Sequence, residues 1–172
     1  MGAECFRYEG VVKMINELDL MEAHWNKYKQ EYTVQAIVLA KHLGVSVDDA
    51  ESYIDDQDYL VLTDEEADQE VYDYIKESVW AFKPSFLSAH TGYIKESVFE
   101  LLQKDCEGAN DAIMSMIKDF DHFVDDAVSC DGRGHFLSGY DGNEHEVPYL
   151  SVVREDMCYK TEKTTYYIYR RN

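Results

Sequence analysis

The densest group of side chains that could perform chemistry lies between residues 131 and 146. Carboxylates and imidazoles stand there among glycines, and such side chains ligate metal ions or transfer protons. The candidates are Asp131, His135, Asp141, Glu144 and His145. Asp141, Asn143 and His145 also match the first three ligand positions of a calcium loop, but Glu146 stands where that loop needs glycine.

The glycines of this segment have a simpler explanation. Those between residues 132 and 142 suit the end of a helix and a hairpin turn, with polar neighbours that solvate the backbone. Arg133, between two glycines, also suits the binding of a phosphate or a carboxylate. We therefore expect a turn with neither metal nor other cofactor. The residues kept as alternative metal ligands are Asp131, His135, Asp141 and His145.

Two smaller combinations could also be reactive. Cys130 and His135 would form a nucleophile and base if the chain between them folds back. His122 and Asp126 are four residues apart on one expected helix, which is a metal-capable pair without a third ligand nearby. The sequence has no phosphate-binding glycine loop, nucleophile elbow, H-E-x-x-H or paired zinc motif. We therefore predict that the protein is not an enzyme.

Charge suggests a different kind of site. Between Val45 and Asp73 the chain has twelve acidic residues and no Lys or Arg. If the whole segment were helical, its rise of ~1.5 Å per residue would give one charge per ~3.6 Å, close to the ~3.4 Å spacing of phosphates along a DNA strand. Such a surface repels nucleic acid and anionic membranes, and it suits a protein that takes the place of nucleic acid on a basic partner.

A second acidic block lies between Asp119 and Glu146, where eight acidic residues accompany one arginine. Ordinary solvated surfaces mix the two signs, whereas a block without bases costs self-repulsion. We therefore infer that the first block binds a partner, with Asp121, Asp125 and Asp126 of the second block as a further patch. The residues expected to contact it are Asp48, Asp49, Glu51, Asp55, Asp56, Asp58, Asp64, Glu65, Glu66, Asp68, Asp121, Asp125 and Asp126.

The composition is that of a folded protein. The chain has 172 residues, 45% of them hydrophobic, with 14 Tyr and 7 Phe, so it is not a disordered acidic tail. Four scattered cysteines without C-x-x-C spacing favour an intracellular protein with reduced thiols. Neither a signal sequence nor an apolar run of ~18 residues is present, so we expect no membrane association.

Helical periodicity dominates the first two thirds of the chain. Gly44 is placed to end one helix, Ser46 and Asn110 to cap others, and Thr63 with Glu66 to form a capping box. The expected inward face of the helix after Thr63 comprises Ala67, Val71, Tyr74, Ile75, Val79 and Phe82. The expected helices cover residues 11–18, 20–29, 33–44, 46–54, 64–82, 85–90, 93–104 and 110–129.

Residues 33–54 resemble the helix-turn-helix of bacterial regulators. The second helix carries five acidic residues and no base, so it would be repelled from the major groove. We therefore expect a structural unit or a protein-binding face, without direct binding of nucleic acid.

Strand patterns appear mainly at the C-terminal end. We expect a strand or buried connection at 59–63, a strand at 135–139 followed by an Asp-Gly turn within 140–144, and strands at 150–153 and 164–169. The predicted fold is α+β, a mainly helical body with a small C-terminal antiparallel β-sheet. Its regions would be 1–58, helical with the helix-turn-helix-like unit, 59–130, the helical core, and 131–172, the β region, in one compact domain.

Three stretches resemble small acidic proteins of bacteriophages and prophages, together over about half of the chain. They are residues 59–68 running on to Val79-Trp-Ala-Phe82, Gly132-Arg-Gly-His-Phe-Leu-Ser-Gly-Tyr-Asp-Gly142, and Tyr167-Ile-Tyr-Arg170. The resemblance implies no catalytic residues. It implies the cytoplasm of an infected bacterium, where such proteins often inhibit host defence, as anti-restriction and anti-CRISPR factors do.

Charge and resemblance lead to the same first hypothesis. It is a non-enzymatic phage inhibitor of a host nuclease or CRISPR effector, acting through an acidic surface that mimics nucleic acid. One alternative is a regulatory or virion-associated protein-interaction module. Another is a small metal-dependent enzyme built on residues 131–146. The sequence leaves the target and the oligomeric state open.

Overall fold

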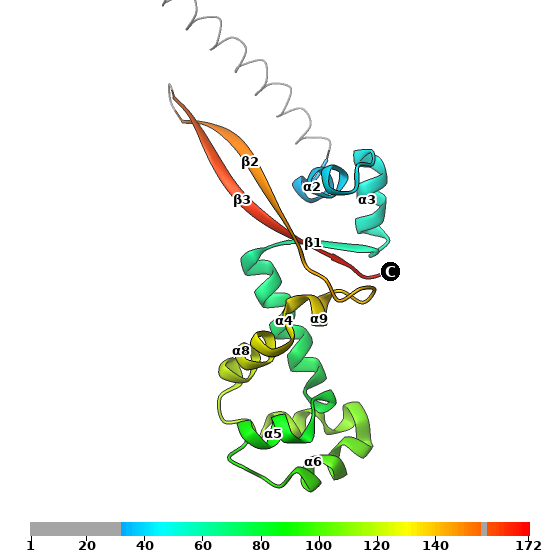
Figure 1. The fold of residues 1–172 in the computed structure, drawn as a ribbon, viewed down its shortest axis with the longest axis vertical. Helices are drawn as coiled ribbons and strands as arrows, with labels where there is room; N and C mark the ends of the chain where they lie inside the picture. The colour runs from blue at the N-terminus through cyan, green and yellow to red at the C-terminus, as the bar shows by residue number, and fades with distance from the viewer. Residues whose placement is uncertain (1–31, 156–157) are drawn as a thin grey trace, which may run out of the picture. The chain divides into compact units, whose positions relative to one another are not determined.

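The computed structural model describes residues 32–155 and 158–172, and the expected helices at 11–18 and 20–29 lie outside this part of the chain. The chain divides into two compact units. The first contains residues 1–56 and 147–166, and the second contains residues 57–146 and 167–172. Along the described chain, which Figure 1 colours from blue to red, two helices precede strand β1, a run of helices follows it, and β2 and β3 come last.

The described helices of the first unit are α2 (Val34–Leu43) and α3 (Val47–Asp55), which pack on each other. Both boundaries follow the sequence signals. Gly44 ends α2 with a left-handed φ of 71°, and the Ser46 hydroxyl accepts a hydrogen bond from the Asp49 backbone at 3.1 Å. Leu39 and Ala50 are fully buried, so the pair has its own apolar contact.

The sheet has three strands in the order β1-β3-β2. They are β1 (Tyr59–Thr63), β2 (His145–Glu155) and β3 (Cys158–Arg170), which include the expected strands at 59–63, 150–153 and 164–169. The end of β3 is fixed to the start of β1, because the Arg171 amide donates to the Asp58 carbonyl at 2.8 Å. The fold is α+β, as the sequence predicts, with a small antiparallel sheet whose third strand comes from the middle of the chain.

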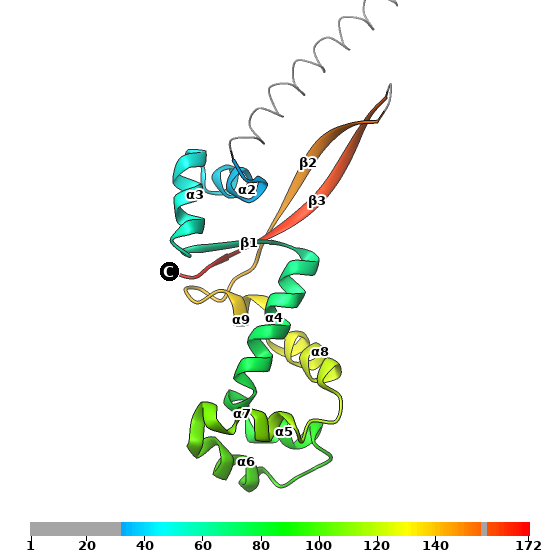
Figure 2. The same cartoon turned by 180° about the vertical axis from the view of Figure 1, so that it is seen from behind.

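Helix α4 (Asp64–Ser78) runs through the second unit, as Figure 2 shows from behind. Its capping box is complete, since Glu66 accepts from the Thr63 backbone at 2.8 Å while Thr63 accepts from the Glu66 backbone. Four positions of the predicted stripe are buried, namely Ala67, Val71, Ile75 and Val79. Tyr74, which we expected to face inward, is 50% exposed because it stands at the edge of this stripe.

Short helices complete the second unit. They are η1 (Val79–Ala81), α5 (Pro84–His90), α6 (Glu96–Leu102), η2 (Gln103–Ala109), α7 (Asn110–Met114), α8 (Phe120–Asp131) and α9 (Arg133–Leu137). Phe99, Ile113, Phe123 and Tyr169 are fully buried around α4. The core is therefore assembled from many short elements and the last residues of β3.

The helix expected at 93–104 starts later and ends earlier than predicted. Tyr93 has a positive φ of 66°, a conformation outside the helical region, so α6 begins at Glu96. The chain changes to a 3₁₀ helix after Leu102, and Cys106 interrupts it with a φ of 51°. Gln103 supports this break because its amide donates to the carbonyls of Trp80 and Phe82, both at 2.6 Å.

The single helix expected at 110–129 is also wrong, since α7 and α8 are separate. The amides of Met116 and Ile117 bond to carbonyls three residues earlier, and the side chain of Asp119 caps α8 at the His122 amide. Asn110 does not cap its own helix as expected. It accepts from the Trp80 backbone at 3.2 Å and donates to the Lys76 carbonyl at 2.8 Å.

The strand expected at 135–139 is helix α9. Gly132 separates it from α8 with a φ of 77°, and Gly134 is buried where the chain returns after the expected Asp-Gly turn. A Cβ on Gly134 would lie 2.5 Å from the Gly142 carbonyl oxygen and 3.0 Å from the Glu144 nitrogen. This close approach of two backbones seats α9 against the turn, and residue alternation alone does not reveal it.

Replacing Gly134 with alanine is predicted to destabilise the protein by about 1–3 kcal/mol, because the new methyl group would collide with rigid backbone. Helix propensity by itself would favour alanine by about 1 kcal/mol, so the sign of the effect is informative. Urea unfolding followed by circular dichroism measures it. Gly108→Ala is the control, since its methyl would meet only the Asp105 side chain, which is free to move away.

Candidate protein-binding surface

The acids of the first block that belong to the first unit lie on α3 or directly after it, and most of them are open to solvent. Asp48 and Asp49 stand in the first turn, where they complement the helix dipole. Asp48 accepts a hydrogen bond from the Tyr32 hydroxyl at 2.7 Å, and Asp49 accepts one from Ser46 at 2.6 Å. Asp55 and Asp56 are exposed at the other end of the helix. Glu51, between them, is half-buried.

The remaining acids of the first block do not continue a single helix. Between α3 and α4 the chain forms a turn and strand β1, so the twelve charges do not follow one helical line. The regular charge spacing expected for a continuous helix is therefore wrong. The acids of α3 belong to the first unit, and those from Asp58 onward belong to the second.

Arg133 neutralises part of the second unit's charge. Its guanidinium lies 2.8 Å from Asp64, 2.9 Å from Asp68 and 2.8 Å from Glu144. The arginine side chain is only 12% exposed, while the Asp64 and Asp68 side chains remain 65% and 69% exposed. Arg133 thus binds carboxylates, as one sequence interpretation allowed, and its ligands come from this chain.

Two tyrosines of β3 complete the arrangement around Arg133. The guanidinium carbon lies 4.2 Å from the centre of the Tyr167 ring, and the buried Tyr169 donates to Glu144 at 2.5 Å. Burial raises the pKa of Tyr169, and its bond to Glu144 raises it further. Burial alone would lower the pKa of Arg133, but its hydrogen bonds to Glu144 and Asp64 outweigh this and raise it.

Other acids near the start of α4 also have structural partners. Glu66 serves the capping box, and Asp58 accepts from the Asn172 amide at 2.8 Å. Glu65 differs, since it is exposed and has no hydrogen-bond or ion-pair partner within the described residues. The acidic block therefore contains both structural carboxylates and unpaired ones, which sequence spacing does not distinguish.

The structure brings one acid of the first block and two of the second together in one groove. A cavity of about 320 Å³ between α4 and α8 is lined by carboxylates from both helices and by a few apolar side chains. Its lining consists of Asp68, Val71, Tyr72, Asp121, Val124, Asp125 and Val128. Burial raises the pKa of Tyr72, and the neighbouring Asp121 carboxylate adds to the effect. Asp121 and Asp125 are exposed and have no basic partner among the described residues.

Asp126 does not line this groove. Its carboxylate lies 3.5 Å from His90 and 3.6 Å from His122. The expected pair of His122 and Asp126 thus forms, and α5 supplies a second histidine. Even so, no three His, Cys, Asp or Glu side chains in the described part of the chain are arranged to hold a metal ion.

The alternative metal ligands at 131–146 fall into separate places. Asp131 and His135 line a cavity of about 580 Å³, whereas Asp141 stabilises the turn. Asp141 accepts from the Asn143 backbone at 3.0 Å and from the Ser138 hydroxyl at 2.8 Å, and both bonds lower its pKa. His145 begins β2. The segment thus contains helix α9 and the turn that follows it.

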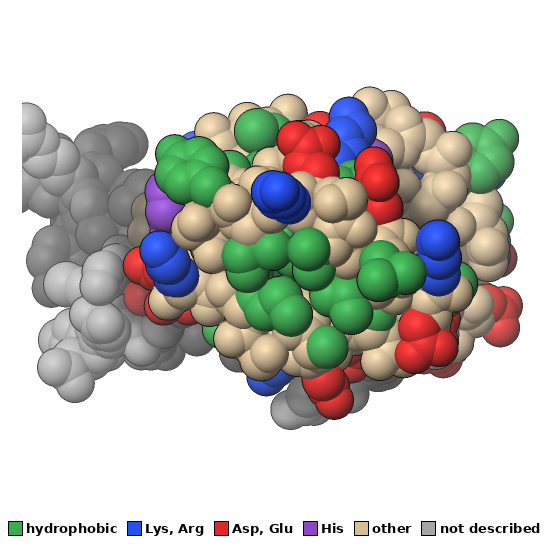
Figure 3. Space-filling model, turned by 90° about the horizontal axis from the view of Figure 1, so that it is seen from below, with side chains coloured by type: hydrophobic (Ala, Val, Ile, Leu, Met, Phe, Trp, Pro, Cys, Tyr) green, Lys and Arg blue, Asp and Glu red, His purple; other side chains and the backbone are tan. Residues whose placement is uncertain are grey.

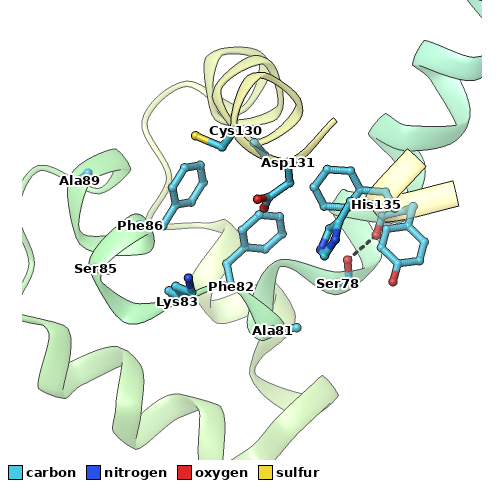
Figure 4. Close-up of a pocket in the computed structure, with 13 residues that line it drawn as sticks. Ser78, Ala81, Phe82, Lys83, Ser85, Phe86, Ala89, Cys130, Asp131 and His135 are labelled. Atoms are coloured by element: carbon cyan, nitrogen blue, oxygen red, sulfur yellow. Dashed lines mark hydrogen bonds between the residues drawn. The ribbon is translucent and has the colours of Figure 1, made fainter. Parts of the chain in front are cut away.

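Figure 4 shows the larger cavity, which sequence reasoning did not find. Cys130 and His135 both line it, so the chain does fold back between them. No hydrogen bond joins the two side chains in the described structure. Tyr74, Phe82, Phe86 and Phe136 form part of its walls. The spacing of Phe and Tyr in the sequence is the same whether they fill a core or line a cavity.

A further surface feature is apolar. Figure 3 shows hydrophobic side chains clustered on the face at the α5 and α6 end of the second unit, with charged residues around them. On and just before α6, Tyr93 is 85% exposed, Leu101 64% and Val98 39%. Exposed apolar clusters of this kind occur at protein interfaces.

Comparison with protein-family models, with curated proteins and with solved structures gives no match for this chain. None of the described helices is long and apolar enough to cross a membrane.

Replacing Arg133 with methionine is predicted to lower the unfolding free energy at pH 7 by about 1–3 kcal/mol. The loss is moderate because Asp64 and Asp68 stay in solvent, although Glu144 keeps only its bond to Tyr169. Thermal unfolding at neutral pH measures the effect. The control is Lys104→Met, which removes an exposed lysine that has no ion-pair partner among the described residues.

The loss of stability in Arg133→Met should depend on pH. The Arg133 hydrogen bond lowers the pKa of Asp64 below its ordinary value of 3.8, so this stabilisation is present above pH 3.8. It is lost as the pH falls through the lowered pKa. The difference in melting temperature between the natural protein and Arg133→Met should therefore shrink below pH 3.8. An unchanged difference at acidic pH would contradict an electrostatic role for Arg133.

Proposed function

We propose that this protein is a non-enzymatic inhibitor that binds a basic, nucleic-acid-binding protein through carboxylates that replace phosphates. The observation that carries the proposal is the groove lined by Asp68, Asp121 and Asp125. Its two helices contribute acids from both acidic blocks, and no base among the described residues neutralises Asp121 or Asp125.

The groove suits lysine and arginine side chains for a physical reason. Carboxylates held on two helices present negative charge without needing to reorganise, and the apolar Val71, Val124 and Val128 exclude some water around them. The net charge of −19 steers a basic partner toward the protein, an attraction that weakens as salt increases. The exposed acids of α3 add to this long-range attraction.

The resemblance to small acidic phage proteins gives the proposal a setting. We place the protein in the cytoplasm of an infected bacterium, with a restriction nuclease or a CRISPR effector as its target. Displacement of nucleic acid from such a target would inhibit host defence without any catalytic step. The metal ligands that the enzyme alternative would need do not form a set within the described residues.

A second candidate is supported by the apolar cluster on α6. A regulatory or virion-associated module would bind its partner mainly through exposed hydrophobic side chains such as Tyr93 and Leu101. Binding of this kind is insensitive to salt and to competing DNA, which separates it from binding through the acidic groove.

Reversing two charges of the groove, in Asp121→Lys/Asp125→Lys, is predicted to abolish binding to the basic partner while the fold is retained, because both residues are exposed. Pull-down from bacterial lysate at low and moderate salt, with and without competing DNA, identifies the partner. Its affinity for the variant should then fall at least about 100-fold, as expected when two attractive contacts become repulsive.

The matched control is Glu100→Lys/Glu107→Lys, which makes the same change in net charge on exposed residues outside the groove. This variant should lose only the long-range attraction and keep most of its affinity. Equal losses in both variants would show that total charge, rather than the groove, determines binding. Loss of binding in Leu101→Asp, with the groove variant unaffected, would support the α6 interaction module instead.

A further inference from the structure

The aromatic cavity of the second unit has the composition of a binding pocket. Its volume is about 580 Å³, within the range of ~300–1,000 Å³ typical of ligand sites. Phe86 stacks near Phe82 with ring centres 5.5 Å apart and planes 24° from parallel. Phe136 continues the row at 6.2 Å and 25° from Phe82, and Tyr74 lies beyond it at 6.1 Å. Aromatic rings thus follow one another along one wall.

One carboxylate lines the cavity together with these rings. In the view of Figure 4 the Asp131 side chain points into the cavity, between Phe86 on one side and His135 on the other. Asp131 has no hydrogen-bond or ion-pair partner in the described part of the chain. It is also the last residue of α8, where a negative charge opposes the helix dipole. The carboxylate is exposed, so it is free to pair with a cation that enters the cavity.

We propose that this cavity binds the guanidinium group of an arginine side chain from a protein partner. Negative aromatic faces attract cations, and a carboxylate beside them adds an ion pair. Arginine fits better than lysine, because its planar group stacks on rings and is less strongly hydrated, and because two of its N–H groups can bond one carboxylate. Phe82 and Phe86 would supply the stacking surface, and Asp131 the carboxylate.

Lys83 is the one Lys or Arg among the described residues that line the cavity, and His135 also lines it. The Lys83 side chain is exposed, so its ammonium group is free to stay in solvent while a cation enters. There it is suited to donate a hydrogen bond to a backbone carbonyl of the partner. Removing this like charge should strengthen the binding of an isolated guanidinium group.

This pocket is independent of the acidic groove. The two cavities share no lining residue, so the pocket inference stands whether or not the groove binds a nucleic-acid-binding protein. The test accordingly uses the purified full chain and a small probe, with no partner protein.

The probe is N-acetyl-L-arginine amide, titrated at pH 7.5 into protein labelled with ¹³C at alanine methyl groups. Ala81, Ala89 and Ala127 line the cavity and should shift, while Ala50 in α3 and Ala112 in α7 serve as references outside it. A probe of this size is expected to bind with a dissociation constant of about 1 mM. The isosteric but neutral N-acetyl-L-citrulline amide should bind at least about tenfold more weakly.

Substitutions test each contribution. Asp131→Asn should weaken binding of the arginine probe about tenfold, and Lys83→Gln should strengthen it. Asp111→Asn, which removes an exposed acid outside the cavity, is the matched control and should leave the affinity unchanged. Three outcomes would overturn the proposal, namely no shift at the cavity alanines, equal shifts with citrulline, or unchanged affinity in Asp131→Asn. The citrulline comparison uses the natural protein, so it stands even if a variant misfolds.

Discussion

A single guanidinium group joins the elements of the second unit. Arg133 holds the first turn of α4 through Asp64 and Asp68, and it holds the turn before β2 through Glu144. Tyr167 covers its face, and Tyr169 shares the Glu144 carboxylate. Because the arginine side chain is largely buried, this charge is tolerable only while its acidic partners remain in place. Helix α9 also packs closely against the returning chain at Gly134, where only glycine fits. This packing depends on the same ion pairs of Arg133.

This constraint divides the acidic residues into two classes. Asp64, Asp68 and Glu144 balance Arg133, Glu66 caps a helix, and Asp58 fixes the C-terminal end. Asp121 and Asp125 have no basic partner among the described residues, and they line the same groove as Asp68, which Arg133 partly neutralises. The proposed recognition of a basic partner thus rests on fewer carboxylates than the sequence contains. Charges that stabilise the fold are less available to a partner, because a competing cation must first displace an existing one.

Two places in the second unit are suited to basic side chains, and they differ in chemistry. The groove between α4 and α8 offers several carboxylates with little aromatic surface. The cavity beside Asp131 offers one carboxylate and a row of aromatic rings. The first arrangement favours phosphate-binding lysines and arginines in general, and the second favours a single planar guanidinium. Both sites belong to a protein of net charge −19, which attracts cations over distances much longer than a hydrogen bond.

Local signals in the sequence determined much of this protein. The capping box at Thr63, the end of α2 at Gly44, the cap at Ser46 and the strands of the sheet depend on neighbouring residues, so their patterns predict them. Tertiary structure alone decided the break between α7 and α8 and the helical form of 133–137, which depend on bonds to distant backbone such as that from Lys118 to His90. It also decided which acids are paired, because Arg133 meets Asp64 and Asp68 across more than 60 residues of chain. Periodicity reports which face of an element is buried, whereas partners brought together from remote segments leave no mark on local spacing.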